Sequence, residues 1–257
     1  MNAKGIWTYQ GALGFSNACV VKASNFACAI GENQPKYVPG LAQISCDIAR
    51  HVYELVGVNT NYIGPSGSDS FFAYKCKPIP LEVVVTGVVK PSYQIWHPEA
   101  KEGDDMHIPA VDFFFLKENV AGTSSEKCLV IKEGNNCYLY ARGNDELYLC
   151  GELQAEDCGD WFESFFRDSI KSAATIVFKY LSHVWSKNNG RLCSLRLQFG
   201  LKPDGKLVLA SPIDYTRWHV IWDGKCLSSH LEECKDNPAE FLEAMKIFRA
   251  LVLKMKL

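Results

Sequence analysis

The first half of the chain carries Ile79-Pro80-Leu81-Glu82-Val83-Val84-Val85-Thr86-Gly87-Val88-Val89-Lys90-Pro91-Ser92. The β-branched run within it is typical of a strand that is covered on both faces. We therefore expect a buried strand over residues 80–89. A second apolar frame, made of a pair of segments, follows later in the chain: Leu195-Arg196-Leu197-Gln198-Phe199-Gly200, then Leu207-Val208-Leu209-Ala210-Ser211-Pro212-Ile213-Asp214. Each of the two segments overlaps a predicted strand.

Periodic patterns elsewhere indicate a mixture of helices and strands. Apolar residues at helical spacing predict helices, and short β-branched runs between turn residues predict strands. The predicted helices span residues 41–56, 160–187 (with Asp160 as N-cap) and 237–256. The predicted strands span residues 6–9, 18–21, 71–75, 80–89, 110–116, 192–199 and 206–210, with a hairpin near 64–69 and a three-stranded meander over 127–153.

Composition limits the class of protein. The chain has 257 residues, 47% of them hydrophobic and 22% charged, which suffices for one large domain or two joined lobes. The net charge of -2 and the lack of a basic stripe argue against nucleic-acid binding. No apolar run approaches the ~18 residues of a membrane span. Eleven cysteines without a CxxC pair favour reduced thiols in the cytoplasm over zinc or disulfide sites.

The two apolar frames resemble the SAICAR synthetase family, whose members are ATP- and Mg-dependent ligases of purine biosynthesis. In that family the corresponding segments read roughly IPLEVVVRxxxxGS and LxLEFG…LADE. Three further segments resemble the family, over about two thirds of the chain in total: the hairpin Tyr9-Gln10-Gly11-Ala12-Leu13-Gly14, the loop Val38-Pro39-Gly40-Leu41-Ala42 and the strand Val111-Asp112-Phe113-Phe114-Phe115-Leu116-Lys117-Glu118. The resemblance implies an α+β, two-lobed fold of antiparallel sheets with packed helices and a central cleft.

The same resemblance implies a domain organisation. We expect an N-terminal β-rich lobe over residues 1–77 and a larger α/β lobe over residues 78–257. The meander near 127–153 lies where the family's Gly-Asp-Pro loop is expected, so it is interpreted as an insertion. The cleft between the lobes is where the family binds its nucleotide.

Several charged positions of the family pattern carry neutral residues here. Ala12, Gly14 and Leu41 stand where the family has lysines, and Thr86 stands where it has an arginine. The two Mg-binding carboxylates of the family fall on Gln198 and Ser211.

Mg prefers anionic oxygens and usually takes at least one carboxylate. The substitutions therefore count against a metal site, while the resemblance still implies ATP as the cofactor.

Other polar residues remain as candidates for ligand binding. The resemblance places Glu82 beside the nucleotide ribose, and Arg217 offers a bidentate fork for an anion. Each candidate also has a structural interpretation: alternating strand lysines usually face solvent, Asp214 caps a turn, and a histidine between apolar neighbours is usually packed. The complete set of candidates is Glu82, Lys75, Lys77, Ser92, Asp214, Arg217 and His219.

The sequence leaves three alternative functions open. The first is a diverged protein without the ordinary ligase activity, which binds a small anionic or nucleotide-like ligand or a protein partner. The second is an active ATP-dependent C–N ligase with a rearranged site, and the third is ordinary SAICAR synthetase activity. Analogy with the family also allows a homo-oligomer. An interaction protein should tolerate changes at Glu82, Asp214 and Arg217, whereas an enzyme should not.

Overall fold

The computed structural model describes residues 7–11, 17–27, 36–118, 125–133, 136–142, 147–153 and 164–256. Its strands are β1 (Trp7–Gly11), β2 (Ala18–Ala23), β3 (Phe26–Ala27), β4 (Lys36–Tyr37), β5 (Tyr62–Gly67), β6 (Ser70–Tyr74), β7 (Lys77–Val88), β8 (Asp105–Glu118), β9 (Ser125–Glu133), β10 (Asn136–Arg142), β11 (Leu147–Glu152), β12 (Gly190–Leu201), β13 (Leu207–Leu209), β14 (Trp218–Trp222) and β15 (Lys225–Cys226). Its helices are α1 (Leu41–Leu55), α2 (Pro91–Gln94), α4 (Ser164–Lys187), α5 (Leu227–Glu233), the 3-10 turn η2 (Cys234–Asp236) and α6 (Pro238–Leu253).

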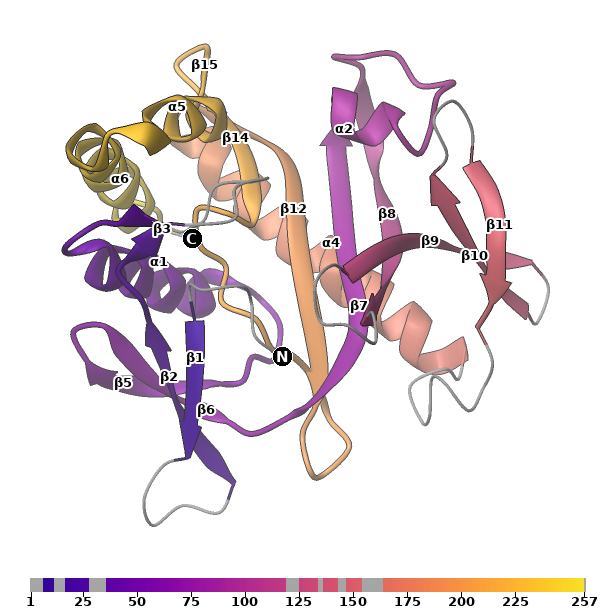
Figure 1. The fold of residues 1–257 in the computed structure, drawn as a ribbon, viewed down its shortest axis with the longest axis horizontal. Helices are drawn as coiled ribbons and strands as arrows, with labels where there is room; N and C mark the ends of the chain where they lie inside the picture. Colours follow the sequence, from indigo (N-terminus) through magenta and orange to yellow (C-terminus); the bar gives the residue numbers. More distant parts are fainter. Residues whose placement is uncertain are drawn as a thin grey trace.

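The strands form antiparallel sheets. A four-stranded sheet has the order β1-β2-β6-β5, and a nine-stranded sheet has the order β11-β10-β9-β8-β7-β12-β14-β15, with β13 paired to β12 (Figure 1). The predicted α+β class with antiparallel sheets is therefore confirmed. The meander predicted over 127–153 corresponds to β9, β10 and β11, which extend the large sheet at one edge.

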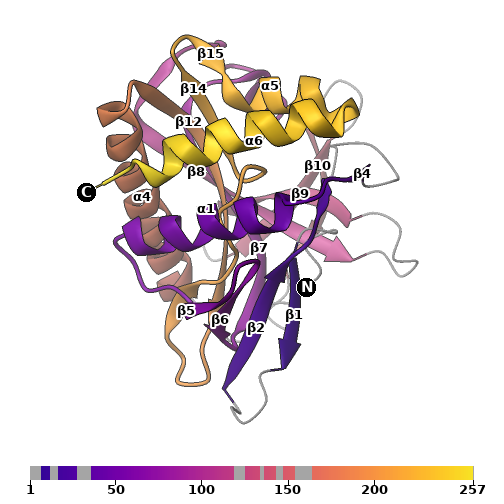
Figure 2. The same cartoon turned by 90° about the vertical axis from the view of Figure 1, so that its left-hand side faces the viewer.

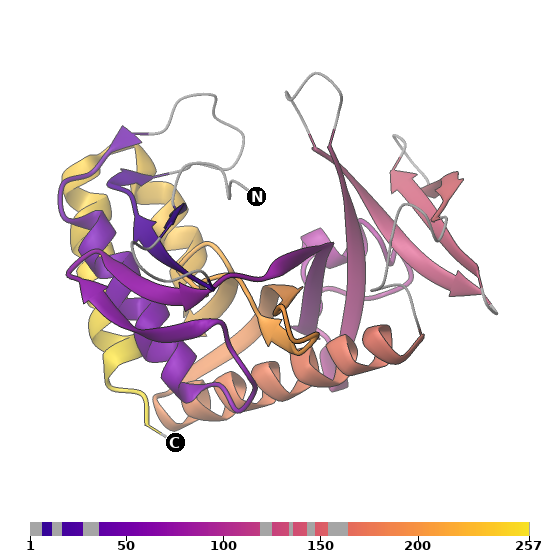
Figure 3. The same cartoon turned by 90° about the horizontal axis from the view of Figure 1, so that it is seen from below.

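The predicted buried strand is β7, the inner strand between β8 and β12. Val83 and Val85 are 1% and 0% exposed, as expected for a strand that is covered by other elements. Helix α4 lies across one face of β7, β8 and β12 (Figure 3). The fully buried indole of Trp185 on this helix packs against Trp218 of β14 and Phe248 of α6.

The last helix of the chain packs against the first one. Helix α6 packs against α1, and the two lie side by side in Figure 2. Asn237 caps α6 by accepting bonds from the backbone N–H groups of Ala239 and Glu240. The division into lobes at residue 77 stays a prediction, although β7 does begin at Lys77.

Several predicted boundaries differ from the structure. Strands β7 and β8 are longer than expected, and α6 ends at Leu253 rather than at residue 256. Lys75 and Lys77 were expected to alternate on one strand, which is wrong, because Lys75 follows the end of β6 and Lys77 begins β7. The strands β14 and β15 and helix α5 were not predicted. Ala12, Gly14 and the proposed N-cap Asp160 lie outside the described residues.

Candidate functional site

A cavity of about 300 Å³ lies where β1, the segment after β6, the start of β7, and strands β12 and β13 approach one another. It is lined by Tyr9, Gln10, Gly11, Cys19, Asn61, Tyr74, Lys75, Cys76, Pro78, Gln198, Phe199, Ala210, Ser211 and Pro212. The cavity thus joins segments from both sheets. Its volume is at the lower end of the range for small-molecule sites.

Two buried oxygens at this cavity have no hydrogen-bond partner among the described residues. Asn61 is 2% exposed; its Nδ2 donates to the Ala210 carbonyl at 3.2 Å, and its Oδ1 accepts nothing. Ser211 is 4% exposed, and its Oγ is also unpaired. Leaving such a group unpaired costs about 1–3 kcal/mol. Both residues line the cavity, so a ligand with N–H or O–H groups that reached these oxygens would satisfy them.

Gln198 and Ser211 meet at the cavity through the backbone. The Ala210 and Ser211 amides donate to the Gln198 carbonyl at 2.9 and 3.4 Å. Their side chains provide an amide and a hydroxyl, which are neutral groups. Among the described residues that line the cavity there is no carboxylate. In the part of the chain that the structure describes, no three His, Cys, Asp or Glu side chains gather to hold a metal.

Tyr9 and Cys76 give the cavity two groups that stay protonated at neutral pH. Burial raises the pKa of Tyr9 to about 12; Cys76 adds to this shift and Arg217 opposes it. Burial also raises the pKa of Cys76 to about 11, with a further contribution from Cys19. Both groups therefore offer hydrogen-bond donors and no negative charge to a ligand.

Asp214 organises the turn beside the cavity. It is 1% exposed, and its Oδ2 accepts from the Trp7 indole Nε1 at 2.7 Å. Its Oδ1 accepts from the Thr216 backbone N–H at 2.9 Å and the Thr216 hydroxyl at 2.6 Å. The predicted turn cap is thus present. The bond from Trp7 also ties β1 to a turn 207 residues away in the chain.

Arg217 follows this turn and faces the large sheet. Its Nη1 lies 3.4 Å from Oε1 of Glu82 on β7, and the two side chains are 15% and 8% exposed. Glu82 pairs with Gln198 of β12 in the sheet register, so it lies near the cavity. Asp214, Arg217 and Glu82, three of the predicted residues, are therefore brought close together.

A group of basic side chains lies beyond Gln198. Lys90 follows the end of β7, Arg196 is on β12 and His219 is on β14; the three are here called the basic cluster. Burial, and secondarily Arg196, lowers the pKa of Lys90 to about 8. Burial, followed by Lys90 and Arg196, lowers the pKa of His219 to about 4. Within the described residues neither Lys90 nor Arg196 forms an ion pair. Mutually repelling cations without a counter-ion favour the binding of an anion.

The remaining predicted residues are spread more widely. Lys75 lines the cavity, whereas Lys77 is exposed at the start of β7 and does not line it. Ser92 is an exposed residue in the short helix α2. His219 lies on β14 in the basic cluster. Whether any of these residues binds a ligand stays a prediction.

Sequence reasoning missed Asn61, Tyr9, Lys90 and Arg196 as site residues. The last two stand within the quoted apolar frames, and each is a cation among apolar neighbours. That pattern is the signal that could have found them. Asn61 carries no such signal, because its importance comes from an unpaired oxygen that only the folded chain shows.

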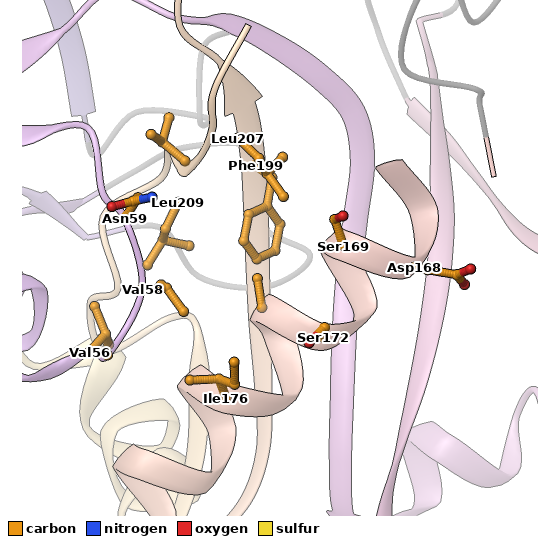
Figure 4. A pocket seen from close by; sticks show the side chains of 13 residues that line it. Val56, Val58, Asn59, Asp168, Ser169, Ser172, Ile176, Phe199, Leu207 and Leu209 are labelled. Atoms are coloured by element: carbon orange, nitrogen blue, oxygen red, sulfur yellow. The ribbon is translucent and has the colours of Figure 1, made fainter. Parts of the chain in front are cut away.

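A second hollow, of about 990 Å³, lies between α4, residues 56–59 and β13 (Figure 4). Ile176 and Leu209 contribute apolar surface, and Ser169, Ser172 and Asp168 border it along α4. None of the predicted ligand-binding residues lines this hollow. A substitution in this hollow can therefore serve as a control for substitutions in the cavity.

The sequence of this chain is similar to those of known proteins. The sequence model of SAICAR synthetase matches residues 3–131. The chain belongs to the SAICAR synthetase family. A phosphoribosylaminoimidazole-succinocarboxamide synthase of Herpetosiphon aurantiacus is 27% identical over 190 residues, which is 73% of this chain and 66% of that protein. The chain thus matches about two thirds of the length of this SAICAR synthetase.

Solved SAICAR synthetase structures share the fold. A type-2 SAICAR synthetase in complex with ADP aligns with a TM-score of 0.74 and 17% identity, covering 99% of this chain and 97% of the other. SAICAR synthetase from Pyrococcus horikoshii aligns with a TM-score of 0.73 and 18% identity, covering 98% and 99%. These likenesses extend over nearly the whole chain, including the segments after residue 131.

Proposed function

We propose that this chain is an ATP-dependent C–N ligase of the SAICAR synthetase type, with the nucleotide in the cavity and an anionic substrate on the basic cluster. The observation that carries the proposal is the pair of cations Lys90 and Arg196, which form no ion pair among the described residues; Arg196 lies two residues along β12 from the cavity-lining Gln198. A ligase that joins two anionic substrates needs such positive charge to hold them together.

The cavity supports the nucleotide part of the proposal. The acceptor Oδ1 of Asn61 suits an exocyclic amine or a ribose hydroxyl, and Tyr9 and Cys76 line the same space without adding negative charge. The family neighbour in complex with ADP supports the same ligand class. Arg217 is restrained by Glu82 and by the turn that Asp214 holds, so its guanidinium is positioned beside the bound reactants.

The residues present do not fit a protein-bound Mg ion. Gln198 and Ser211 offer neutral oxygens, and Mg usually requires at least one carboxylate. We therefore derive no step through a metal held by these side chains. This misfit favours a second candidate function, a nucleotide-binding protein without ligase activity. A cytoplasmic location belongs to both candidates and is supported by the free thiols of the described cysteines.

The first experiment measures ADP binding by calorimetry with and without Mg, on the wild type and on Asn61→Ala. Binding that Asn61→Ala weakens by about tenfold, the value of one hydrogen bond, would support the cavity as the nucleotide site. The control is Ser172→Ala, which alters the second hollow and should leave binding unchanged. Wild-type affinity for ADP in Asn61→Ala would contradict the assignment.

The second experiment separates the two candidates. Purified protein is supplied with carboxylated aminoimidazole ribotide, aspartate and Mg-ATP, and product is followed by chromatography. Product that disappears in Arg196→Gln supports the ligase. ADP binding without product supports the second candidate, and the double variant Gln198→Glu/Ser211→Asp should then make ADP binding Mg-dependent by restoring two carboxylates.

A further inference from the structure

Cys226 stands at the junction of β15 and α5 with several groups directed at its sulfur. Its Sγ lies 3.2 Å from Nε2 of His219. It accepts hydrogen bonds from the backbone N–H of Ser229 at 3.3 Å and from the Ser229 hydroxyl at 3.0 Å. A thiol within reach of an imidazole, with two further donors on its sulfur, has the arrangement of an activated nucleophile.

The surroundings of this thiol are positively charged. Lys90 and Cys226 lie within electrostatic range of each other, and Arg196 and Cys193 act on the same lysine. His219 has its pKa lowered to about 4 by burial and by the two cations, so its ring is neutral at neutral pH and Nε2 can accept a hydrogen bond from the thiol, while Lys90 and Arg196 supply the positive charge that favours the thiolate. Partly exposed cysteines beside Lys, Arg and His are the ones that react with electrophiles and disulfides.

A second cysteine offers a contrast on the same helix. Cys234, at the other end of α5, has its Sγ 3.9 Å from Nδ1 of His230. Burial, Glu240 and Glu233 raise the pKa of this thiol. Both cysteines are partly exposed and both lie near a histidine. The two thiols therefore differ in the sign of the neighbouring charge, in the distance to the histidine and in the two hydrogen bonds that Ser229 donates to Cys226.

We propose that Cys226 is a nucleophilic thiol that forms mixed disulfides with small anionic disulfides, and that this modification covers the basic cluster. The sulfur of Cys226 attacks one sulfur of the reagent. A new S–S bond forms, the reagent's S–S bond breaks, and the leaving thiolate takes up the proton released by Cys226. Cys226 is oxidised to the mixed disulfide, and one half of the reagent is reduced to a thiol.

The test uses two aromatic disulfides of similar size, the dianionic dithiobis(nitrobenzoate) and the neutral dithiodipyridine. Wild-type protein is treated for short times, and each cysteine is quantified by peptide mass spectrometry. With the anionic reagent we expect Cys226 to react at least about tenfold faster than Cys234, because a positive site raises the local concentration of anions. With the neutral reagent this ratio should fall severalfold.

A charge variant provides the second measurement. Lys90→Gln should slow the anionic reagent at Cys226 and leave the neutral reagent nearly unchanged, and inorganic phosphate should also slow the anionic reagent in the wild type. Equal rates at Cys226 and Cys234 would overturn the proposal. So would a rate ratio that is the same for both reagents. None of these readouts depends on ligase activity, so the proposed function can fail while this inference stands.

Discussion

Replacing Trp7 by Phe isolates the buried hydrogen bond between β1 and the turn at Asp214. The change removes the indole Nε1 donor, which lies 2.7 Å from Oδ2 of Asp214, and keeps most of the ring that packs on Phe71. A hydrogen bond to a charged group contributes about 1.5–3 kcal/mol. The smaller ring adds about 1 kcal/mol for the space it leaves. We therefore expect the free energy of unfolding to fall by about 2.5–4 kcal/mol.

The assay is urea unfolding followed by circular dichroism, with Trp222→Phe as the matched control. Trp222 donates its Nε1 to the Asn188 carbonyl at 3.1 Å, a neutral acceptor, and is only partly buried. That variant should lose about 1–2 kcal/mol. Equal losses in the two variants would refute the reasoning, because the charge on Asp214 would then contribute nothing to the fold.

Three further predictions concern a glycine, a histidine and a lysine. Gly87→Ala should lower the free energy of unfolding by about 1–3 kcal/mol in urea, because a Cβ there would lie 2.6 Å from Cζ of Phe178; an unchanged midpoint would contradict it. The hydrogen bond with Asp112 raises the pKa of His97, so protonated His97 stabilises the fold at acidic pH, and this contribution is lost as the pH rises through the raised value. Urea unfolding should show that Asp112→Asn reduces the stability gained on acidification from about pH 8.5 to about pH 5.5, and an identical pH dependence would argue against the pair. Phosphate affinity, measured by calorimetry, should fall as the pH passes about 8 because Lys90 loses its charge there; Lys90→Arg should abolish that fall, and a fall that persists would assign it to another group.

The apolar elements of the fold could be predicted because their periodicity is carried by adjacent residues. The Val83-Val84-Val85 run and the apolar face of α1 indicated a covered strand and a helix, and the structure has both. Strand β14 was missed although the Asp223-Gly224 turn directly after Trp218-His219-Val220-Ile221-Trp222 is a hairpin signal. Short segments of this kind gain their conformation from pairing with β12, which the sequence does not display.

The candidate site was predicted less completely because its residues meet only in three dimensions. Glu82 and Arg217 were found through the family pattern and Asp214 as a remaining polar residue, and the structure brings the three together. Lys90 was not found, since a lysine at the end of a strand usually faces solvent. Its significance comes from burial next to Arg196, which raises the cost of its charge and leaves the pair in need of an anion.

Strand β12 separates core residues from site residues within one element. Leu195 and Leu197 are fully buried, whereas Arg196 and Gln198, which alternate with them along the strand, lie on the other face and are only partly buried. Because side chains alternate along a strand, the two sets face different surroundings. The core set is constrained by packing, whose loss costs about 2–5 kcal/mol for a Leu-to-Ala change. The partly buried set is constrained less by packing, so we expect that Gln198→Glu would leave the sheet intact.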